Sequence, residues 1–184
     1  MSFPIKKFLW SLYVKQRRLF EPLAFFLYRQ HFAKIDPRDW KNALQLDLNS
    51  FISLVNEYPY RQDKLHGILD CVLQKGKEGY FFADLKHCRD CDDFARIFSL
   101  YLLAHPEWIH ISEYLVMDLK HVFKSAHFVT VAQKEDGKWY LFNYQMKGPF
   151  STEEEALAGV YLYKTTAYRY SMNAFSYIRY RSWI

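Results

Sequence analysis

The chain has 184 residues, of which 51% are hydrophobic and 20% aromatic, and its formal net charge is +5. A chain of this length and apolar content can bury one well-formed core, which excludes an intrinsically disordered protein. Three cysteines without a recognisable signal peptide exclude a disulfide scaffold and predict a reducing, cytoplasmic environment. The apolar run at residues 8–14 is too short for a transmembrane segment.

Positive charge is concentrated at the two ends of the chain. Residues 1–34 contain seven Lys or Arg and the single acid Glu21, and residues 161–184 contain four Lys or Arg and no acid. Aromatic residues are interleaved with these cations, a pattern that can bind an anionic partner such as nucleic acid, anionic lipid or an acidic protein. The alternative is that the aromatic residues belong to the core and the cations form its solvated flank. The absence of a nucleic-acid module motif favours this second interpretation.

Helical periodicity dominates the first half of the chain. Residues 3–33 have the spacing of a helix that is interrupted or restarted at Pro22. Asp36 and Pro37 are typical of a helix start, because Asp can cap the first turn and Pro fits within it. Apolar residues at helical spacing continue this helix as far as Pro59.

Two further helices are expected before the middle of the chain. The first covers residues 63–73 and ends at the glycine-containing segment 75–79. The second begins at Cys91, carries apolar residues at helical spacing, and ends at His105 and Pro106.

Beyond Pro106 the apolar spacing changes from helical to alternating. The sequence Glu-Asp-Gly-Lys at 135–138 is typical of a hairpin turn, and Ser-Thr-Glu-Glu at 151–154 resembles the capping box of a short helix. Helices followed by an antiparallel sheet predict an α+β fold. The expected strands are residues 114–117, 127–133, 139–145 and 160–170.

Cys91, at the start of its helix, and two residues on later strands could together form an activated sulfur nucleophile. Cys91 stands where the helix begins, His127 at the head of a strand, and Asn143 on the next strand across a hairpin turn. The even spacing of His127 and Asn143 lets both side chains point to one face of the sheet. Thiol enzymes that use an amide to orient the imidazole have the same order of Cys, His and Asn. The sequence therefore predicts a catalytic triad of Cys91, His127 and Asn143.

The chemistry of this triad depends on lowering the pKa of a thiol from its ordinary value of about 8.5. A helix N-terminus and a nearby imidazolium both stabilise the thiolate, and the imidazolium of His127 can later donate a proton to the leaving amine. The backbone N–H of Cys91 could supply half of an oxyanion hole. Each residue also has a structural explanation: a small buried Cys91, a core or edge His127, and an Asn143 that merely ends its strand.

Three segments of this chain together resemble the transglutaminase-like superfamily. They are Arg-Asp-Cys-Asp-Asp-Phe-Ala at 89–95, Ala-His-Phe-Val-Thr-Val at 126–131 and Trp-Tyr-Leu-Phe-Asn at 139–143. The chain is most similar to the bacterial transglutaminase-like cysteine proteinases, and the resemblance covers about residues 50–146. It implies a papain-like α+β fold, with the Cys at a helix start and the other two catalytic residues on neighbouring strands.

Two positions depart from the pattern of that family. Arg89 stands where the family usually has Gly, and Asn143 where it commonly has an acid. An amide would orient the imidazole without charge, so the departure at Asn143 is compatible with activity. In some relatives acids beside the nucleophile bind calcium, which here implies Asp90 and Asp92. Calcium takes about 6–8 oxygen ligands, and acids at a helix start are also explained by the helix dipole, so the predicted reaction requires no cofactor.

Cys88 and Cys91 also form a Cys-x-x-Cys arrangement, which allows two other interpretations. A redox pair of the thioredoxin type would need a preceding strand, and the sequence does not predict one. A zinc site would need two more ligands, and Cys71 and the histidines are not placed at a recognisable paired spacing. Both interpretations are weaker than the triad.

We expect a catalytic domain at residues 47–184 that follows a helical extension at residues 1–46. The predicted function is that of a cysteine peptidase or amidase acting on a peptide or protein. One alternative is transglutaminase-type acyl transfer to an amine. The other is a catalytically degenerate binding module that uses the basic aromatic termini.

Overall fold

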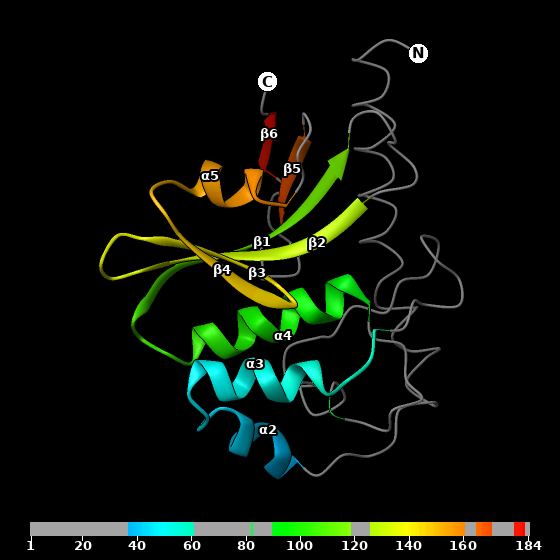
Figure 1. Ribbon diagram of the computed structural model, residues 1–184, viewed down its shortest axis with the longest axis vertical. Helices are drawn as coiled ribbons and strands as arrows, with labels where there is room; N and C mark the ends of the chain where they lie inside the picture. The colour runs from blue at the N-terminus through cyan, green and yellow to red at the C-terminus, as the bar shows by residue number, and fades with distance from the viewer. Residues whose placement is uncertain are drawn as a thin grey trace.

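The computed structural model of the chain describes residues 37–60, 82, 90–118, 126–160, 165–170 and 179–182. The described helices and strands lie in a layered arrangement (Figure 1). In chain order they are α2 (Pro37–Ala43), α3 (Leu48–Asn56), α4 (Cys91–Leu103), β1 (Trp108–Asp118), β2 (Ala126–Lys134), β3 (Trp139–Asn143), β4 (Gln145–Phe150), α5 (Glu153–Ala158), β5 (Thr165–Tyr170) and β6 (Arg179–Ser182).

The strands form one sheet in the order β4-β3-β2-β1-β5-β6. Every neighbouring pair is antiparallel. Helices come first and an antiparallel sheet follows, so the predicted α+β class is confirmed.

Helices cover both faces of this sheet. Helix α4 packs on one face and α5 on the other, and α3 and α2 lie outside α4 (Figure 1). Side chains of β2 alternate between the two faces of the sheet. Ala132 belongs to the apolar cluster with α3 and α4. Val129 and Val131 point to the other face and pack with Ala156 and Leu157 of α5. The sheet is therefore the central layer, with a separate apolar cluster on each side.

Helix α4 forms where the sequence predicts it. Asp90 is its N-cap and its Oδ1 accepts a hydrogen bond from the backbone N–H of Asp92 at 3.4 Å. The helix ends at Leu103, with Ala104 as C-cap, two residues before Pro106. The expected start at Cys91 is confirmed. Nearly every side chain of the helix is buried, because sheet and helix α3 enclose it from both sides.

The single helix expected between Asp36 and Pro59 is wrong, because the structure has two helices there. Asp47 separates them and caps α3, accepting hydrogen bonds from the backbone N–H groups of Asn49 at 3.0 Å and Ser50 at 3.1 Å. A side chain that satisfies two N–H groups at a helix start favours a new helix over continuation of the old one. Continuous apolar spacing concealed this break, because both helices face the same core.

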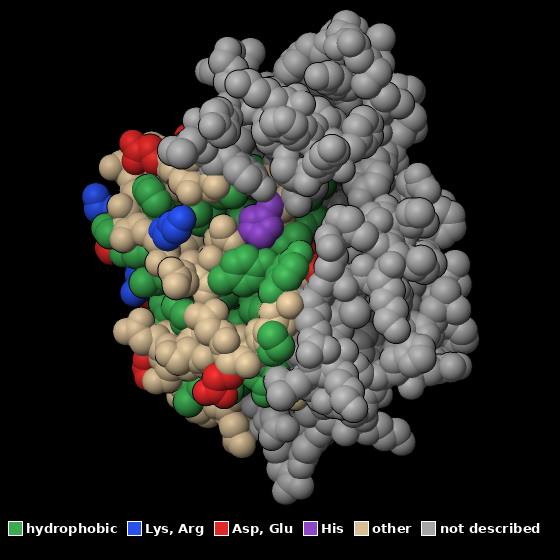
Figure 2. Space-filling model, turned by 45° about the vertical axis from the view of Figure 1, so that its right-hand side comes forward, with side chains coloured by type: hydrophobic (Ala, Val, Ile, Leu, Met, Phe, Trp, Pro, Cys, Tyr) green, Lys and Arg blue, Asp and Glu red, His purple; other side chains and the backbone are tan. Residues whose placement is uncertain are grey.

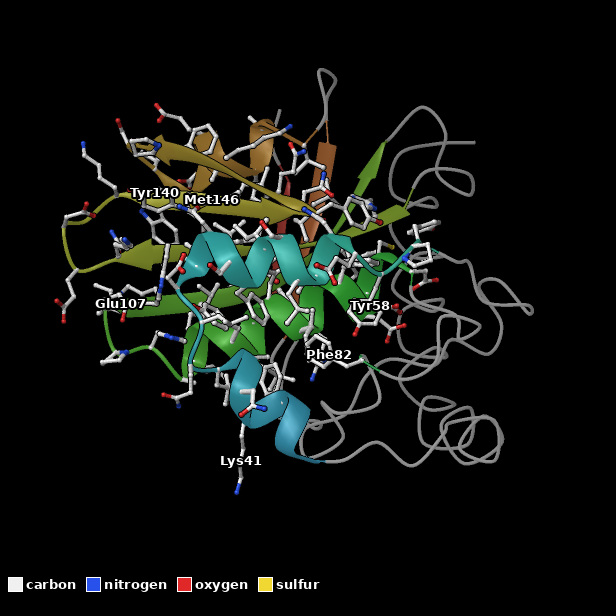
Figure 3. All side chains as sticks on the ribbon, turned by 60° about the horizontal axis from the view of Figure 1, so that its bottom comes forward. Lys41, Tyr58, Phe82, Glu107, Tyr140 and Met146 are labelled. Carbon is white, nitrogen blue, oxygen red and sulfur yellow. The ribbon has the colours of Figure 1, made fainter. Side chains whose placement is uncertain are left out.

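The short helices α2 and α3 and the side chain of Phe82 pack on the outer side of α4. Ala43 is fully buried, and the rings of Tyr58 and Phe82 lie 5.5 Å apart (Figure 3). Tyr140 and Met146 pack against the same cluster from the sheet. Ala43 falls within the predicted extension at residues 1–46, yet it joins the apolar core formed with α3, α4 and the sheet. The boundary itself stays a prediction, since residues 1–36 lie outside the described part of the chain.

Three features of the second half differ from expectation. Strand β1 begins at Trp108, earlier than the predicted residues 114–117. The missed part has exposed Ile109 and His110 and buried polar Ser112 and Glu113, so it shows no apolar alternation. Strand β4 was not predicted; it is an edge strand containing Gly and Pro, residues that read as a turn. Strand β6 was not predicted either.

The helix start before α5 is shifted by one residue from the predicted capping box. Thr152 is the N-cap, and its Oγ1 accepts a hydrogen bond from the Glu155 N–H at 3.1 Å. The Glu155 carboxylate in turn accepts from the backbone N–H of Ser151 at 2.8 Å. The N-cap bond of a capping box is present between Thr152 and Glu155, but the return bond from the Glu155 carboxylate goes to Ser151, one residue before the N-cap.

Several predictions fall on residues outside the described part of the chain. They are the helices at residues 3–33 and 63–73, the side chains of the basic termini, Cys71, Cys88 and Arg89. Within the described ranges, no helix combines the length and the apolar character needed to cross a membrane.

Candidate functional site

The predicted nucleophile, Cys91, is the first residue of α4 and is partly exposed. The N-terminus of a 13-residue helix carries a partial positive charge, which favours a thiolate over a thiol. Three carboxyl groups at the same helix start oppose this effect, because a negative charge nearby disfavours a second one. A thiolate at Cys91 therefore needs a positive partner besides the helix.

His127 and Asn143 form a short hydrogen bond, with 2.6 Å between His127 Nε2 and Asn143 Oδ1. An amide oxygen only accepts, so the imidazole nitrogen Nε2 is the donor in this pair. The neutral imidazole then has its proton on Nε2, and Nδ1 keeps its lone pair. The interaction orients the ring and leaves Nδ1 able to accept a proton.

The pKa of His127 lies below its ordinary value because burial disfavours the imidazolium. The hydrogen bond to Asn143 acts in the opposite direction and raises the pKa, but its effect is the smaller one. The ring is therefore a neutral base near pH 7, which is the state that can accept a proton from a thiol.

The topology brings these residues to one end of the sheet. Helix α4 is followed directly by β1, and β1, β2 and β3 are antiparallel neighbours. Cys91 at the start of α4, His127 near the start of β2 and Asn143 at the end of β3 consequently share an end (Figure 1). The predicted hairpin between His127 and Asn143 is confirmed.

The alternation of β2 adds a constraint that the sequence did not reveal. Thr130 faces α4, where its hydroxyl donates to the carbonyl oxygen of Ala95 at 2.6 Å. Val129 and Val131 face α5 on the other side, and His127 has the same parity as these two residues. To reach Cys91 at the start of α4, the His127 side chain therefore has to turn around the end of the sheet.

Tyr144 links His127 to the first turn of α4 through ring contacts, and this residue was not predicted from the sequence. Its ring centroid lies 5.8 Å from that of His127 and 4.7 Å from that of Phe94, one turn after Cys91 on α4. Tyr144 also interacts electrostatically with Cys91. Its position directly after Asn143 was the available signal, but a Tyr at a strand end has no distinctive pattern.

Tyr60 continues the aromatic contacts of Tyr144 to the surface. Its ring centroid is 6.0 Å from that of Tyr144, and its side chain is half exposed. Figure 2 shows a face of the molecule on which a histidine side chain borders hydrophobic side chains.

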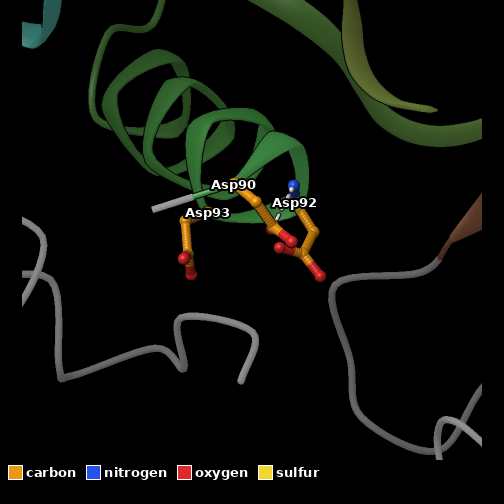
Figure 4. A group of neighbouring side chains, drawn as sticks. All are labelled: Asp90, Asp92 and Asp93. Carbon is orange, nitrogen blue, oxygen red and sulfur yellow. Dashed lines mark hydrogen bonds between the residues drawn. The ribbon is translucent and has the colours of Figure 1, made fainter. Parts of the chain in front are cut away.

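Asp90, Asp92 and Asp93 form a buried acidic cluster at the start of α4 (Figure 4). One carboxylate oxygen from each lies within 4.8 Å of the others. The family resemblance implied calcium at Asp90 and Asp92, and Asp93 adds a third carboxylate at the same place. Three carboxylates supply at most six of the about 6–8 oxygens that calcium takes, and Asp90 already caps the helix. Calcium binding stays a prediction.

A second polar group is buried between α4 and the sheet, one turn further along the helix. Arg96 Nε lies 2.8 Å from Glu113 Oε1 on β1, without an aligned hydrogen bond between these two atoms. Burial raises the pKa of Glu113, and the Arg96 guanidinium partly offsets that rise. Ser99 and Thr130 are joined by their hydroxyl groups at 3.0 Å beside this pair.

No family model matches this chain, and neither a curated protein nor a solved structure was found to match it. The roles proposed for Cys91, His127 and Asn143 therefore rest on the residues and the geometry of this chain.

Proposed function

We propose that the protein is a thiol-dependent hydrolase of amide bonds, a cysteine peptidase or amidase with a papain-like, transglutaminase-like fold. The observation that carries the proposal is the 2.6 Å hydrogen bond between His127 and Asn143, at the end of the sheet where α4 begins with Cys91. An oriented imidazole together with a thiol at a helix start is the arrangement that activates a sulfur nucleophile, and it requires the His127 ring to reach Cys91 around the end of the sheet.

The reaction begins with transfer of the Cys91 thiol proton to His127. Because Nε2 donates to Asn143, Nδ1 is the nitrogen that accepts this proton. The sulfur attacks the amide carbonyl, the C–N bond breaks, and the imidazolium returns the proton to the leaving amine. Water then cleaves the thioester, with His127 as its base, and the products are an acid and an amine.

The polarity of the site fits this sequence of steps. A neutral imidazole is ready to accept the first proton, and its lowered pKa makes the imidazolium a stronger acid toward the leaving amine. The imidazolium also supplies the positive charge that a Cys91 thiolate needs because three carboxyl groups lie near it. Asn143 remains neutral throughout and fixes the ring orientation.

The proposal is tested by alkylation of Cys91 with iodoacetamide as a function of pH, with each cysteine followed separately by peptide mass spectrometry. We expect Cys91 near neutral pH to react faster than Cys71 and Cys88, and His127→Ala to slow it by about 100-fold. Asn143→Ala should slow it less, because the imidazole remains but loses its orientation. His110→Ala, which removes an exposed histidine on β1, is the matched control and should leave the rate unchanged.

A Cys91 that reacts no faster than Cys71 and Cys88 in the wild type and in His127→Ala alike would exclude the triad. Given a reactive Cys91, assays of peptide hydrolysis, ammonia release and amine incorporation on the same substrates separate hydrolysis from acyl transfer. A binding module would instead give salt-sensitive association with an anionic partner that Cys91→Ala does not affect.

A further inference from the structure

Tyr144 occupies a backbone conformation that its side chain disfavours. It lies between β3 and β4, where Asn143 faces Gln145 across the turn, and its φ is 59°. Left-handed backbone suits Gly or Asn, whereas a bulky side chain there costs conformational free energy. Strain of this kind is concentrated at functional sites, so the choice of Tyr needs an explanation from what its ring contacts.

The Tyr144 ring contacts aromatic rings from three separate segments. They are Phe94 of α4 at 4.7 Å, His127 of β2 at 5.8 Å and Tyr60 beyond α3 at 6.0 Å between centroids. The contact with Phe94 is edge-to-face, with an interplanar angle of 70°. A Gly or Asn at this turn would retain the backbone path and lose all three contacts.

The electrostatic surroundings of Tyr144 keep its phenol neutral. Burial raises the pKa of Tyr144 above its ordinary value, and Cys91, Tyr60, Asp90 and Asp92 raise it further. A neutral ring next to His127 adds no charge to the imidazole and displaces water from it. This matches the lowered pKa of His127, for which burial is the main cause.

We propose that Tyr144 is a positioning residue: its ring holds the His127 imidazole toward the start of α4 and shields the hydrogen bond between His127 and Asn143 from water. The strained turn is retained because a residue directly after Asn143 is the one able to cover that bond while reaching Phe94. This inference rests on the proposed function, since the positioned imidazole is the one that activates Cys91.

Two substitutions in the full-length chain separate the ring from its hydroxyl and from the turn. Tyr144→Phe keeps the ring and removes the hydroxyl. Tyr144→Asn keeps a residue suited to left-handed backbone and removes the ring, and Tyr144→Gly replaces it if the Asn variant does not fold. Lys147→Ala, an exposed position on β4, is the control for unspecific effects on the hairpin.

Three quantities are measured for each variant: the alkylation rate of Cys91, the imidazole pKa of His127 by NMR, and the thermal unfolding temperature. We expect Tyr144→Phe to alkylate within about twofold of the wild type, and Tyr144→Asn to be slower by about 10-fold to 100-fold. The pKa of His127 should rise toward its ordinary value in Tyr144→Asn because water reaches the ring. The unfolding temperature shows that each variant is folded at the temperature of the rate and NMR measurements.

The proposal is overturned if Tyr144→Asn leaves both the alkylation rate and the His127 pKa at their wild-type values. It is also overturned if Tyr144→Phe is as slow as Tyr144→Asn, since the hydroxyl would then be the acting group. The NMR measurement is repeated in a Cys91→Ala background, where no thiol chemistry occurs. A His127 pKa that depends on Tyr144 there supports the positioning role, even if Cys91 in the wild type reacts like an ordinary thiol.

Discussion

The two halves of α4 are both largely buried but differ in chemistry. The first half carries the buried charged residues Asp92, Asp93 and Arg96. The second half is mainly apolar, and its Phe98 packs against aromatic rings of α3 and β3. One helix thus has a polar half beside Cys91 and an apolar half within the core.

This difference in chemistry indicates that the apolar half stabilises the fold and that the polar half lies at the candidate site. Burying apolar area is favourable, whereas burying charge costs free energy even when the charge is paired. A chain selected only for stability would continue the apolar pattern to the helix start. The polar half is therefore the part of α4 whose residues need a functional explanation.

The largest effect is expected in the apolar half. Phe98 is fully buried, with ring centroids 6.0 Å from Phe51 and 5.6 Å from Phe142. Phe98→Ala should lower the free energy of unfolding by about 4 kcal/mol, because it removes transfer energy and leaves a cavity. Leu103→Ala on the exposed side of the same helix is the control and should change it by less than about 0.5 kcal/mol. Urea denaturation measures both, and equal losses would contradict a core centred on Phe98.

The buried ion pair gives the next largest effect. Arg96→Met leaves Glu113 buried without its cation and should cost about 3 kcal/mol near neutral pH in urea denaturation. Replacing both residues, Arg96→Met with Glu113→Leu, should restore or exceed wild-type stability. A double variant clearly less stable than the wild type would show that the pair itself stabilises the fold, and the polar half of α4 would then need no functional explanation.

The pH dependence of the Arg96→Met variant follows from the raised pKa of Glu113. Because the folded state binds that proton more tightly than the unfolded state, the stability contributed by Glu113 is complete below its unfolded pKa and is lost as the pH rises through the folded value. The cost of Arg96→Met should therefore shrink as the pH falls toward about 4.5. A cost independent of pH would exclude Glu113 as its origin.

The smallest effect concerns the acidic cluster. Asp90→Asn preserves an N-cap side chain, so without metal it should change stability by less than about 0.5 kcal/mol. If the cluster binds calcium, millimolar calcium raises the unfolding temperature of the wild type, and Asp90→Asn reduces that rise. Magnesium at equal concentration is the control for ionic strength. No rise in the wild type with calcium would make the predicted site wrong.

Much of the secondary structure was predictable from local chemistry. The start of α4 follows from Asp90 before an apolar helical pattern, and the turn between β2 and β3 follows from the sequence around Gly137. Two errors have physical causes that local patterns do not contain. Asp47 started a new helix inside a continuous apolar stripe, and the first part of β1 lacks apolar alternation because Ser112 and Glu113 are buried polar residues while Ile109 is exposed.

The candidate site was predictable only in part. The even spacing of His127 and Asn143 across a hairpin indicated that they could face each other, and the structure brings them to 2.6 Å. The proposed role of Tyr144 could not be predicted, because it depends on a left-handed turn and on ring contacts between residues distant in sequence. The same holds for the pairing of Arg96 with Glu113.

The sequence by itself determined the class of the fold, the helix that begins at Cys91, and the order of the residues proposed for catalysis. These depend on the spacing of apolar residues and on caps, which act over a few positions along the chain. Only the tertiary structure decided on which face of the sheet the His127 side chain lies and which residue contacts both His127 and α4. Antiparallel pairing and helix packing set those relations, and they join residues that local patterns cannot connect.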